Sequence, residues 1–248
     1  MRNLWAITRK EMYSYFVSPV AYVVMALLLA ALGFFFSIRL VQNGEATMRY
    51  AFQDSQFFLL LMAPLIAMRL IAEEKRQGTI ELLLTSPVRD WELVLGKFLA
   101  GLLLIVITLA GTLVYVAILV RYGTPRIHVG FLQLADLEWG PILSGYLGEL
   151  LLAGAFLAVC LVASSITQNQ IVAGVVGLIA LIMLWVAGSV STVVGPPVSD
   201  FLSYVSITNH LDSFTRGELN SMDVAYYLSF IVLGLFLSIQ ALAARRWR

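Results

Sequence analysis

Charged residues, histidine and cysteine are all scarce in this 248-residue chain. Only 12% of its residues are charged and 60% are hydrophobic, whereas globular proteins average about 25% charged residues. A soluble core of this length could not bury so much apolar surface, so we expect lipid to be the solvent. The net charge of +1 favours neither a nucleic-acid nor an acidic partner.

The residue patterns of common catalytic and metal sites are missing as well. Cys160 is the single cysteine and forms no intramolecular disulfide. His128 and His210 have no ligand-like neighbour at i+4, and without HExxH or paired Cys/His spacing we expect no metal site. The absence of GxSxG argues against an intramembrane hydrolase. Gly96-Lys97 lacks the rest of a phosphate loop, so we expect no ATP bound by that motif. From these missing patterns together we expect no enzyme activity and no cofactor bound by this chain.

Long uncharged runs indicate six membrane-spanning helices, since about 20 apolar residues cross a bilayer. We expect an all-α polytopic membrane protein with a single transmembrane domain over 1–248, and spans at approximately 19–40, 55–72, 96–120, 142–166, 171–194 and 224–244. Ser18-Pro19 is a typical helix start, and Gly195-Pro196-Pro197 must stop the fifth span. The second span is the weakest, because its uncharged stretch is short and contains Pro64.

Lysine and arginine counting predicts the orientation of these spans. With the N-terminus inside, eleven of the 16 Lys and Arg residues fall in inner segments and five in outer ones. Both termini and the loop between the second and third spans are therefore expected in the cytoplasm. Basic residues Arg2, Arg9 and Lys10 precede the first span without a small-residue cleavage pattern, so we expect no cleavable signal.

Two flanking segments carry helical apolar spacing. Residues 3–16 are expected to form an amphipathic helix in the inner interface. The outer loop 198–223 should hold helical structure that ends at Arg216-Gly217. This loop either caps the outer mouth or contacts substrate. Glu149, at the outer start of the fourth span, is expected to be an interfacial residue rather than a functional one.

The loop 69–97 holds ten of the chain's 31 charged residues. Gly78 can end one helix, and Thr79 can N-cap a short helix over 80–84 with Glu81 in its first turn. Ser86 and Pro87 then predict the start of the helix that leads into the third span.

Leu82-Leu83-Leu84 forms an apolar knob on this small element. An exposed leucine forgoes roughly 1.5–3 kcal/mol of burial free energy. We therefore expect the three leucines to pack against an apolar surface, either on the inner ends of this chain's own spans or in another protein.

The stretch Glu73-Glu74-Lys75-Arg76-Gln77-Gly78-Thr79-Ile80-Glu81-Leu82-Leu83-Leu84-Thr85-Ser86-Pro87 resembles the signature loop of ABC-2 type transporter permeases. The later runs 161–170 and 244–248 look like the gliding-motility-type branch of that superfamily. The resemblance covers essentially the whole chain.

The resemblance implies a coupling helix between spans two and three, and a dimer of permease chains, identical or related, docked on two ATPase subunits. ATP and Mg²⁺ would bind in that partner, in a bacterial plasma (inner) membrane. An extracytoplasmic auxiliary protein and membrane lipid are further expected partners, and nucleic acid is not. The ATPase-coupling residues would be Glu73, Glu74, Gly78, Thr79, Ile80, Glu81, Leu82, Leu83, Leu84 and Pro87, and a second cytoplasmic contact would be Thr167, Gln168, Asn169 and Gln170.

Two functions of different classes fit these features. One is the membrane subunit of an ATP-driven exporter. The other is a non-transporting scaffold that links a cytoplasmic ATPase to an extracytoplasmic partner. Secondary transport would need intramembrane carboxylates or inverted repeats, and the sequence offers neither.

Overall fold

The computed structural model of the protein describes residues 2–43, 47–79, 88–122, 126–129, 132–135 and 137–246. The elements are α1 (Arg2–Val17), α2 (Pro19–Asn43), α3 (Arg49–Leu70), α4 (Ala72–Arg76), α6 (Asp90–Gly111), α7 (Leu113–Tyr122), β1 (Arg126–Val129), β2 (Leu132–Ala135), α8 (Trp139–Ile166), α9 (Gln170–Ser191), α10 (Val198–Val205), α11 (Leu211–Thr215) and α12 (Ser221–Arg246).

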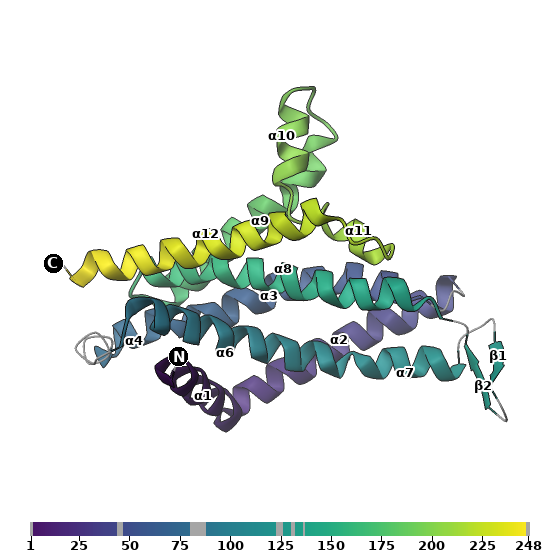
Figure 1. The fold of residues 1–248 in the computed structure, drawn as a ribbon, viewed down its shortest axis with the longest axis horizontal. Helices are drawn as coiled ribbons and strands as arrows, with labels where there is room; N and C mark the ends of the chain where they lie inside the picture. Colours follow the sequence, from purple (N-terminus) through teal and green to yellow (C-terminus); the bar gives the residue numbers. More distant parts are fainter. Residues whose placement is uncertain are drawn as a thin grey trace.

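Six helical segments are long and apolar enough to cross a membrane, which confirms the predicted all-α polytopic fold. They run over Ala21–Gln42, Arg49–Arg76, Asp90–Tyr122, Trp139–Ile166, Gln170–Ser191 and Ser221–Ala244. The sequence did not predict the small antiparallel hairpin of β1 and β2, in which Arg126 pairs with Ala135. This hairpin lies at the end of the bundle opposite α4 (Figure 1).

The central helices are α8 and α3, which are buried along most of their length, whereas α2 is exposed along most of its own. The long helices run side by side, and α10 projects away from them (Figure 1). The main core includes Phe156, Leu157 and Leu161 of α8 and Leu70 of α3. Burial of these side chains holds the helices together through close packing.

The second span is longer than its uncharged stretch indicated. Helix α3 begins at Arg49 and continues through Pro64. Near its start, Asp54 accepts a hydrogen bond of 3.2 Å from Arg39 of α2. The charged residues Arg49 and Asp54 therefore belong to the helix, beyond its uncharged part. A proline is tolerated in a membrane helix because neighbouring groups satisfy the freed backbone.

The N-terminal segment is helical as predicted. Helix α1 packs across the end of α6 that is predicted to face the cytoplasm (Figure 1). The approach is close, since a Cβ at Gly96 would lie 2.9 Å from Ile7 and 3.2 Å from the carbonyl oxygen of Leu4. Thr8 donates a 3.0 Å hydrogen bond to the Gly96 carbonyl oxygen. Gly96 therefore lets the two helices touch.

The loop 198–223 contains α10 and α11, and its helical part ends as expected at Arg216 and Gly217, where Gly217 has φ +90°. His210 Nδ1 lies 2.7 Å from Asp223 Oδ1, which ties α11 to the start of α12. Gly148 of α8 accommodates Leu211 and Phe214, since a Cβ there would lie within 2.8 Å of both side chains. The loop is thus packed on the bundle through α11.

Glu149 is not an interfacial residue, and that expectation was wrong. Its side chain is fully buried, and Oε1 lies 2.6 Å from the Ser55 hydroxyl of α3. The uncharged run that begins at Leu150 suggested that Glu149 lies at the start of the span, but α8 already begins at Trp139. Glu149 therefore lies inside the bundle, between α8 and α3.

Candidate functional site

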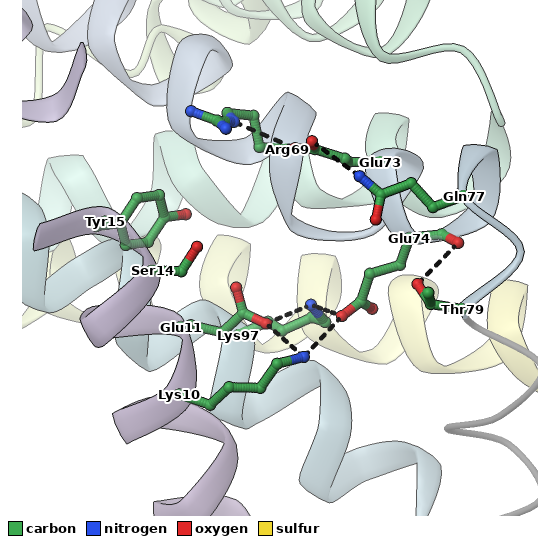
Figure 2. Close-up of a pocket in the computed structure, with 10 residues that line it drawn as sticks. All are labelled: Lys10, Glu11, Ser14, Tyr15, Arg69, Glu73, Glu74, Gln77, Thr79 and Lys97. Carbon is green, nitrogen blue, oxygen red and sulfur yellow. Dashed lines mark hydrogen bonds and ion pairs between the residues drawn. The ribbon is translucent and has the colours of Figure 1, made fainter. Parts of the chain in front are cut away.

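Charged side chains from α1, α4 and α6 meet at the end of the bundle where the loop 69–97 begins (Figure 2). We call this loop the hairpin, as distinct from the β1–β2 pair. Lys97 Nζ of α6 lies 2.9 Å from Glu11 Oε1 of α1 and 2.8 Å from Glu74 Oε1 of α4. Lys10 Nζ lies 3.7 Å from the same Glu74 oxygen. We call Lys10, Glu11, Glu74 and Lys97 the charge cluster.

Lys97 is the best-shielded member of the charge cluster, with only 1% of its side chain exposed. A buried ammonium is stable only when paired and hydrogen-bonded. Two lysines and two glutamates balance in charge, so the cluster can stay buried while it joins three helices. Lys10 is 66% exposed, and its pairing contributes little because water screens it.

Glu73 forms a second, more exposed group on the neighbouring face of α4. Its Oε2 accepts a 3.2 Å hydrogen bond from Arg69 Nε, and its Oε1 accepts one of 3.2 Å from Gln77. These contacts fix the orientation of Arg69 more than they stabilise the fold, because the pair is partly in water.

The junction between α3 and α4 is fastened to the end of α8. The Ser164 hydroxyl oxygen accepts from the backbone N–H groups of Ile71 and Ala72, at 3.3 and 3.1 Å. These N–H groups begin a new helix and would otherwise lack partners. Lys75, which is buried, donates to the carbonyl oxygen of Ser165. The base of the hairpin is therefore joined to α8 as well as to α1 and α6.

The residues predicted to couple to an ATPase divide into two groups in the structure. Glu73 and Glu74 lie in α4, and Gly78 follows it with φ +71°, a left-handed conformation that favours glycine. The Thr79 hydroxyl donates a 3.3 Å hydrogen bond back to the Glu74 carbonyl oxygen. Ile80, Glu81, Leu82, Leu83, Leu84 and Pro87 lie outside the described residues, as does the predicted short helix.

The predicted helix start at Ser86-Pro87 lies outside the described residues. Within the described part, helix α6 begins at Asp90, after Arg89 in an extended conformation (ψ 145°). Glu92 Oε2 accepts a 3.2 Å hydrogen bond from the Arg89 backbone N–H. This capping interaction, with a glutamate three residues into the helix, stabilises the start of α6 at Asp90.

The second predicted contact, 167–170, forms a tight turn between α8 and α9. Asn169 Oδ1 accepts from the backbone N–H groups of Ile171 and Val172, at 2.9 and 3.3 Å, and so caps α9. Thr167 ends α8, and Gln168 is exposed between them, with Gln170 the first residue of α9. The turn follows directly after Ser164 and Ser165, so it lies at the same end of the molecule as α4.

Sequence reasoning missed the residues that hold this end together, namely Lys10, Glu11, Lys75, Lys97 and Ser164. Lys97 gave one usable signal, because a lysine at the head of a long apolar run needs acidic partners nearby. Nothing in the spacing of the sequence identifies Glu11 and Glu74 as those partners, because 63 residues separate them.

A chamber of about 280 Å³ lies beside the charge cluster, and ten residues line it (Figure 2): Lys10, Glu11, Ser14, Tyr15, Arg69, Glu73, Glu74, Gln77, Thr79 and Lys97. Burial, reinforced by the nearby Glu11 carboxylate, raises the pKa of Tyr15, so its phenol stays neutral. Within the described residues, no group of three or more His, Cys, Asp or Glu side chains is arranged to hold a metal ion. The chamber offers hydrogen-bonding and charged groups.

The family model described as "ABC-2 family transporter protein" matches residues 5–246. Comparison with curated proteins gives no significant match.

Proposed function

Because the chain belongs to the ABC-2 family of transporter proteins, it is a membrane-spanning permease subunit of an ABC transporter, and we propose that the hairpin 69–97 couples it to ATP hydrolysis in a separate subunit. Family membership implies an ABC ATPase subunit as partner. We further propose that the transporter is an exporter of the gliding-motility-type branch, acts as a permease dimer in a bacterial inner membrane, and works with ATP and Mg²⁺ bound to the ATPase.

The attachment of α4 carries this proposal. Lys97 and Glu11 connect Glu74 to α6 and α1, and Ser164 and Ser165 connect the start of α4 to α8. A displacement of the hairpin would therefore act on several helices at once, because close-packed elements move together rather than deform continuously.

The coupling itself requires contacts that differ between two states of the transporter. In our proposal, ATP-driven closure of the ATPase dimer pushes the hairpin, and α4 transmits the push to α1, α6 and α8. The turn 167–170 receives a second, smaller contact from the ATPase, since it adjoins Ser165. Repacking of spans one, two and five against the second permease then opens a path outward.

Gly78 provides the sharpest test of this role. Its φ of +71° strains any residue with a Cβ, although no atom lies within 4 Å of where that Cβ would be. We expect Gly78→Val to reorient the hairpin and abolish the ATPase stimulation that the permease gives to its partner, without loss of membrane insertion. Replacing Leu82 and Leu83 with Asp should have the same result.

Gly140→Val is the matched control, because Gly140 also has open space around its Cβ position and lacks a positive φ. It lies in the first turn of α8, at the end of that helix opposite Ser165. ATPase stimulation measured on the purified complex should be normal in this control. Normal stimulation in Gly78→Val and in the leucine variants would refute the coupling role.

A non-transporting scaffold, which would also recruit an ATPase, makes a different prediction. It requires complex formation but no nucleotide-dependent rearrangement of the hairpin. Crosslinks between the hairpin and the ATPase that are indifferent to ATP would favour the scaffold, and an extracytoplasmic partner bound at the loop 198–223 would be its second attachment.

A further inference from the structure

An apolar groove opens beside the polar chamber, with a volume of about 210 Å³. Residues of α2, α3 and α6 form its apolar walls: Ala21, Val24, Met25, Met62, Leu65, Ile66, Met68 and Leu104. One end of the groove is polar, where Tyr15, Arg69, Glu73 and Gln170 complete the lining. The groove thus has an apolar body and a polar end, and it lies between helices that span the membrane.

The groove and the chamber share Tyr15, Arg69 and Glu73 in their linings. The two spaces are therefore neighbours across these three side chains. A ligand that occupied both would have a polar part at the chamber and an apolar part along α2 and α3. This is the shape of a lipid rather than that of a peptide or a sugar.

Tyr15 supplies a donor at this boundary. Only 8% of the residue is exposed, and within the part of the chain that the structure describes its hydroxyl has no hydrogen-bond partner. In Figure 2 the hydroxyl points into the chamber. Because Tyr15 lines the chamber, its hydroxyl is free to donate a hydrogen bond to a ligand atom there.

Arg69 supplies a second set of donors. Its Nε donates to Glu73 Oε2 at 3.2 Å, and this is the one hydrogen bond that its guanidinium makes with described residues. Figure 2 shows a terminal nitrogen of Arg69 directed away from Glu73. Glu73 holds the guanidinium in place while its outer N–H groups stay available. A guanidinium presents paired donors that match the oxygens of a phosphate.

We propose that the groove and chamber bind one phospholipid from the membrane leaflet on the side of the chain termini. Its phosphate accepts hydrogen bonds from Arg69 and Tyr15, and one acyl chain lies along Met25, Met62 and Leu65. A groove of about 210 Å³ is below the usual range of roughly 300–1,000 Å³ for small-molecule sites. It therefore takes part of the lipid, and the rest stays in the bilayer.

The lipid headgroup, rather than the acyl chain, provides the selectivity of this site. Lipid tails in the bilayer are as apolar as the groove, so burying a chain there brings little gain. In the single chain, Tyr22, Val23 and Leu27 on one flank of α2 are exposed, and we expect a lipid to reach the groove past this flank. This proposal stands apart from ATPase coupling, because it concerns binding in the absence of nucleotide.

The test uses native mass spectrometry of the purified chain in detergent, titrated with three probes. These are phosphatidylglycerol, diacylglycerol with the same chains, and glycerol phosphate. We expect saturable one-to-one binding of phosphatidylglycerol. Diacylglycerol should bind at least about tenfold more weakly, the loss expected for a missing charge-assisted hydrogen bond. Glycerol phosphate should neither bind detectably nor compete.

Two variants separate the polar and apolar parts of the site. Arg69→Ala should bring the affinity for phosphatidylglycerol most of the way down to that for diacylglycerol, with the Tyr15 hydrogen bond remaining. Leu65→Trp, at a residue that is 47% exposed and lines the groove, should block both lipids without disturbing the core. The matched controls are Arg121→Ala, at the opposite end of the bundle, and Leu233→Trp, at a 56% exposed position of α12. Both controls should bind as the wild type does.

Three results would overturn the proposal. The first is equal binding of phosphatidylglycerol and diacylglycerol by the wild type. The second is wild-type binding by both Arg69→Ala and Leu65→Trp, with normal helix content by circular dichroism. The third is full competition by glycerol phosphate, which would make the chamber a site for free phosphate rather than for a lipid.

Discussion

Replacement of Lys97 by methionine removes the ammonium that, among the described residues, contacts both Glu11 and Glu74 at hydrogen-bond distance. Methionine has a similar length and suits the apolar surroundings, so the change tests charge rather than packing. Breaking a buried ion pair on one side typically costs about 3–5 kcal/mol, because the remaining charge loses its compensation. The two carboxylates keep 15% and 13% exposure, and Lys10 remains close, so we expect about 2–3 kcal/mol.

Lys10→Met is the matched control for this prediction. It removes an equal charge from the same cluster, but Lys10 is 66% exposed, so the expected cost is about 0–1 kcal/mol. The triple variant Lys97→Met, Glu11→Gln, Glu74→Gln should recover most of the lost stability, because the one charge that it leaves in the cluster, Lys10, is 66% exposed to water.

Thermal unfolding of the detergent-solubilised chain measures the effect. For a chain of this size about 1 kcal/mol corresponds to roughly 2–4 °C in Tm, so Lys97→Met should lower Tm by about 4–12 °C. Equal Tm values for Lys97→Met and Lys10→Met would refute the view that the buried lysine holds α1, α4 and α6 together. A triple variant no more stable than Lys97→Met would contradict the charge argument in particular.

Two further substitutions test the packing of the bundle. Glu149→Gln should keep the Tm within about 2 °C of wild type, because the amide can still bond to Ser55. Glu149→Ala should cost about 2–4 kcal/mol, because it leaves a cavity and an unpaired Ser55 hydroxyl. Equal Tm values for the two variants would contradict this. Gly96→Leu should detach α1 from α6, since even a Cβ would meet Ile7 at 2.9 Å. Proteolysis near the N-terminus should then be faster than in the control Gly195→Leu, where the space around the Cβ position is open. Unchanged proteolysis would mean that α1 does not depend on this contact.

The sequence was sufficient for the features that depend on local pattern. Uncharged length predicted the six spans, and glycine preferences predicted the chain reversals at Gly78 and Gly217. Both have positive φ, at +71° and +90°. These features follow from hydropathy and backbone conformation, which each segment determines largely by itself.

Features that depend on tertiary contact were missed or misjudged. Glu149 was expected at an interface because the uncharged run begins one residue later, but the helix starts at Trp139. Lys97 gave no indication of its partners, because they come from helices that meet it only in the folded bundle. The cap that Glu92 provides at the start of α6 was also missed, because a glutamate three residues into a helix is a weak signal in sequence.

Photo-crosslinking from position 79 tests the contact between the hairpin and the ATPase, because the Thr79 side chain turns back to α4 at the base of the hairpin. The crosslinker p-benzoylphenylalanine would replace Thr79 in the intact complex, and its products would be compared with and without ATP. Our account predicts crosslinks to the ATPase subunit whose pattern or yield changes when ATP is bound. Crosslinks that ignore ATP, or that never reach the ATPase, would contradict it.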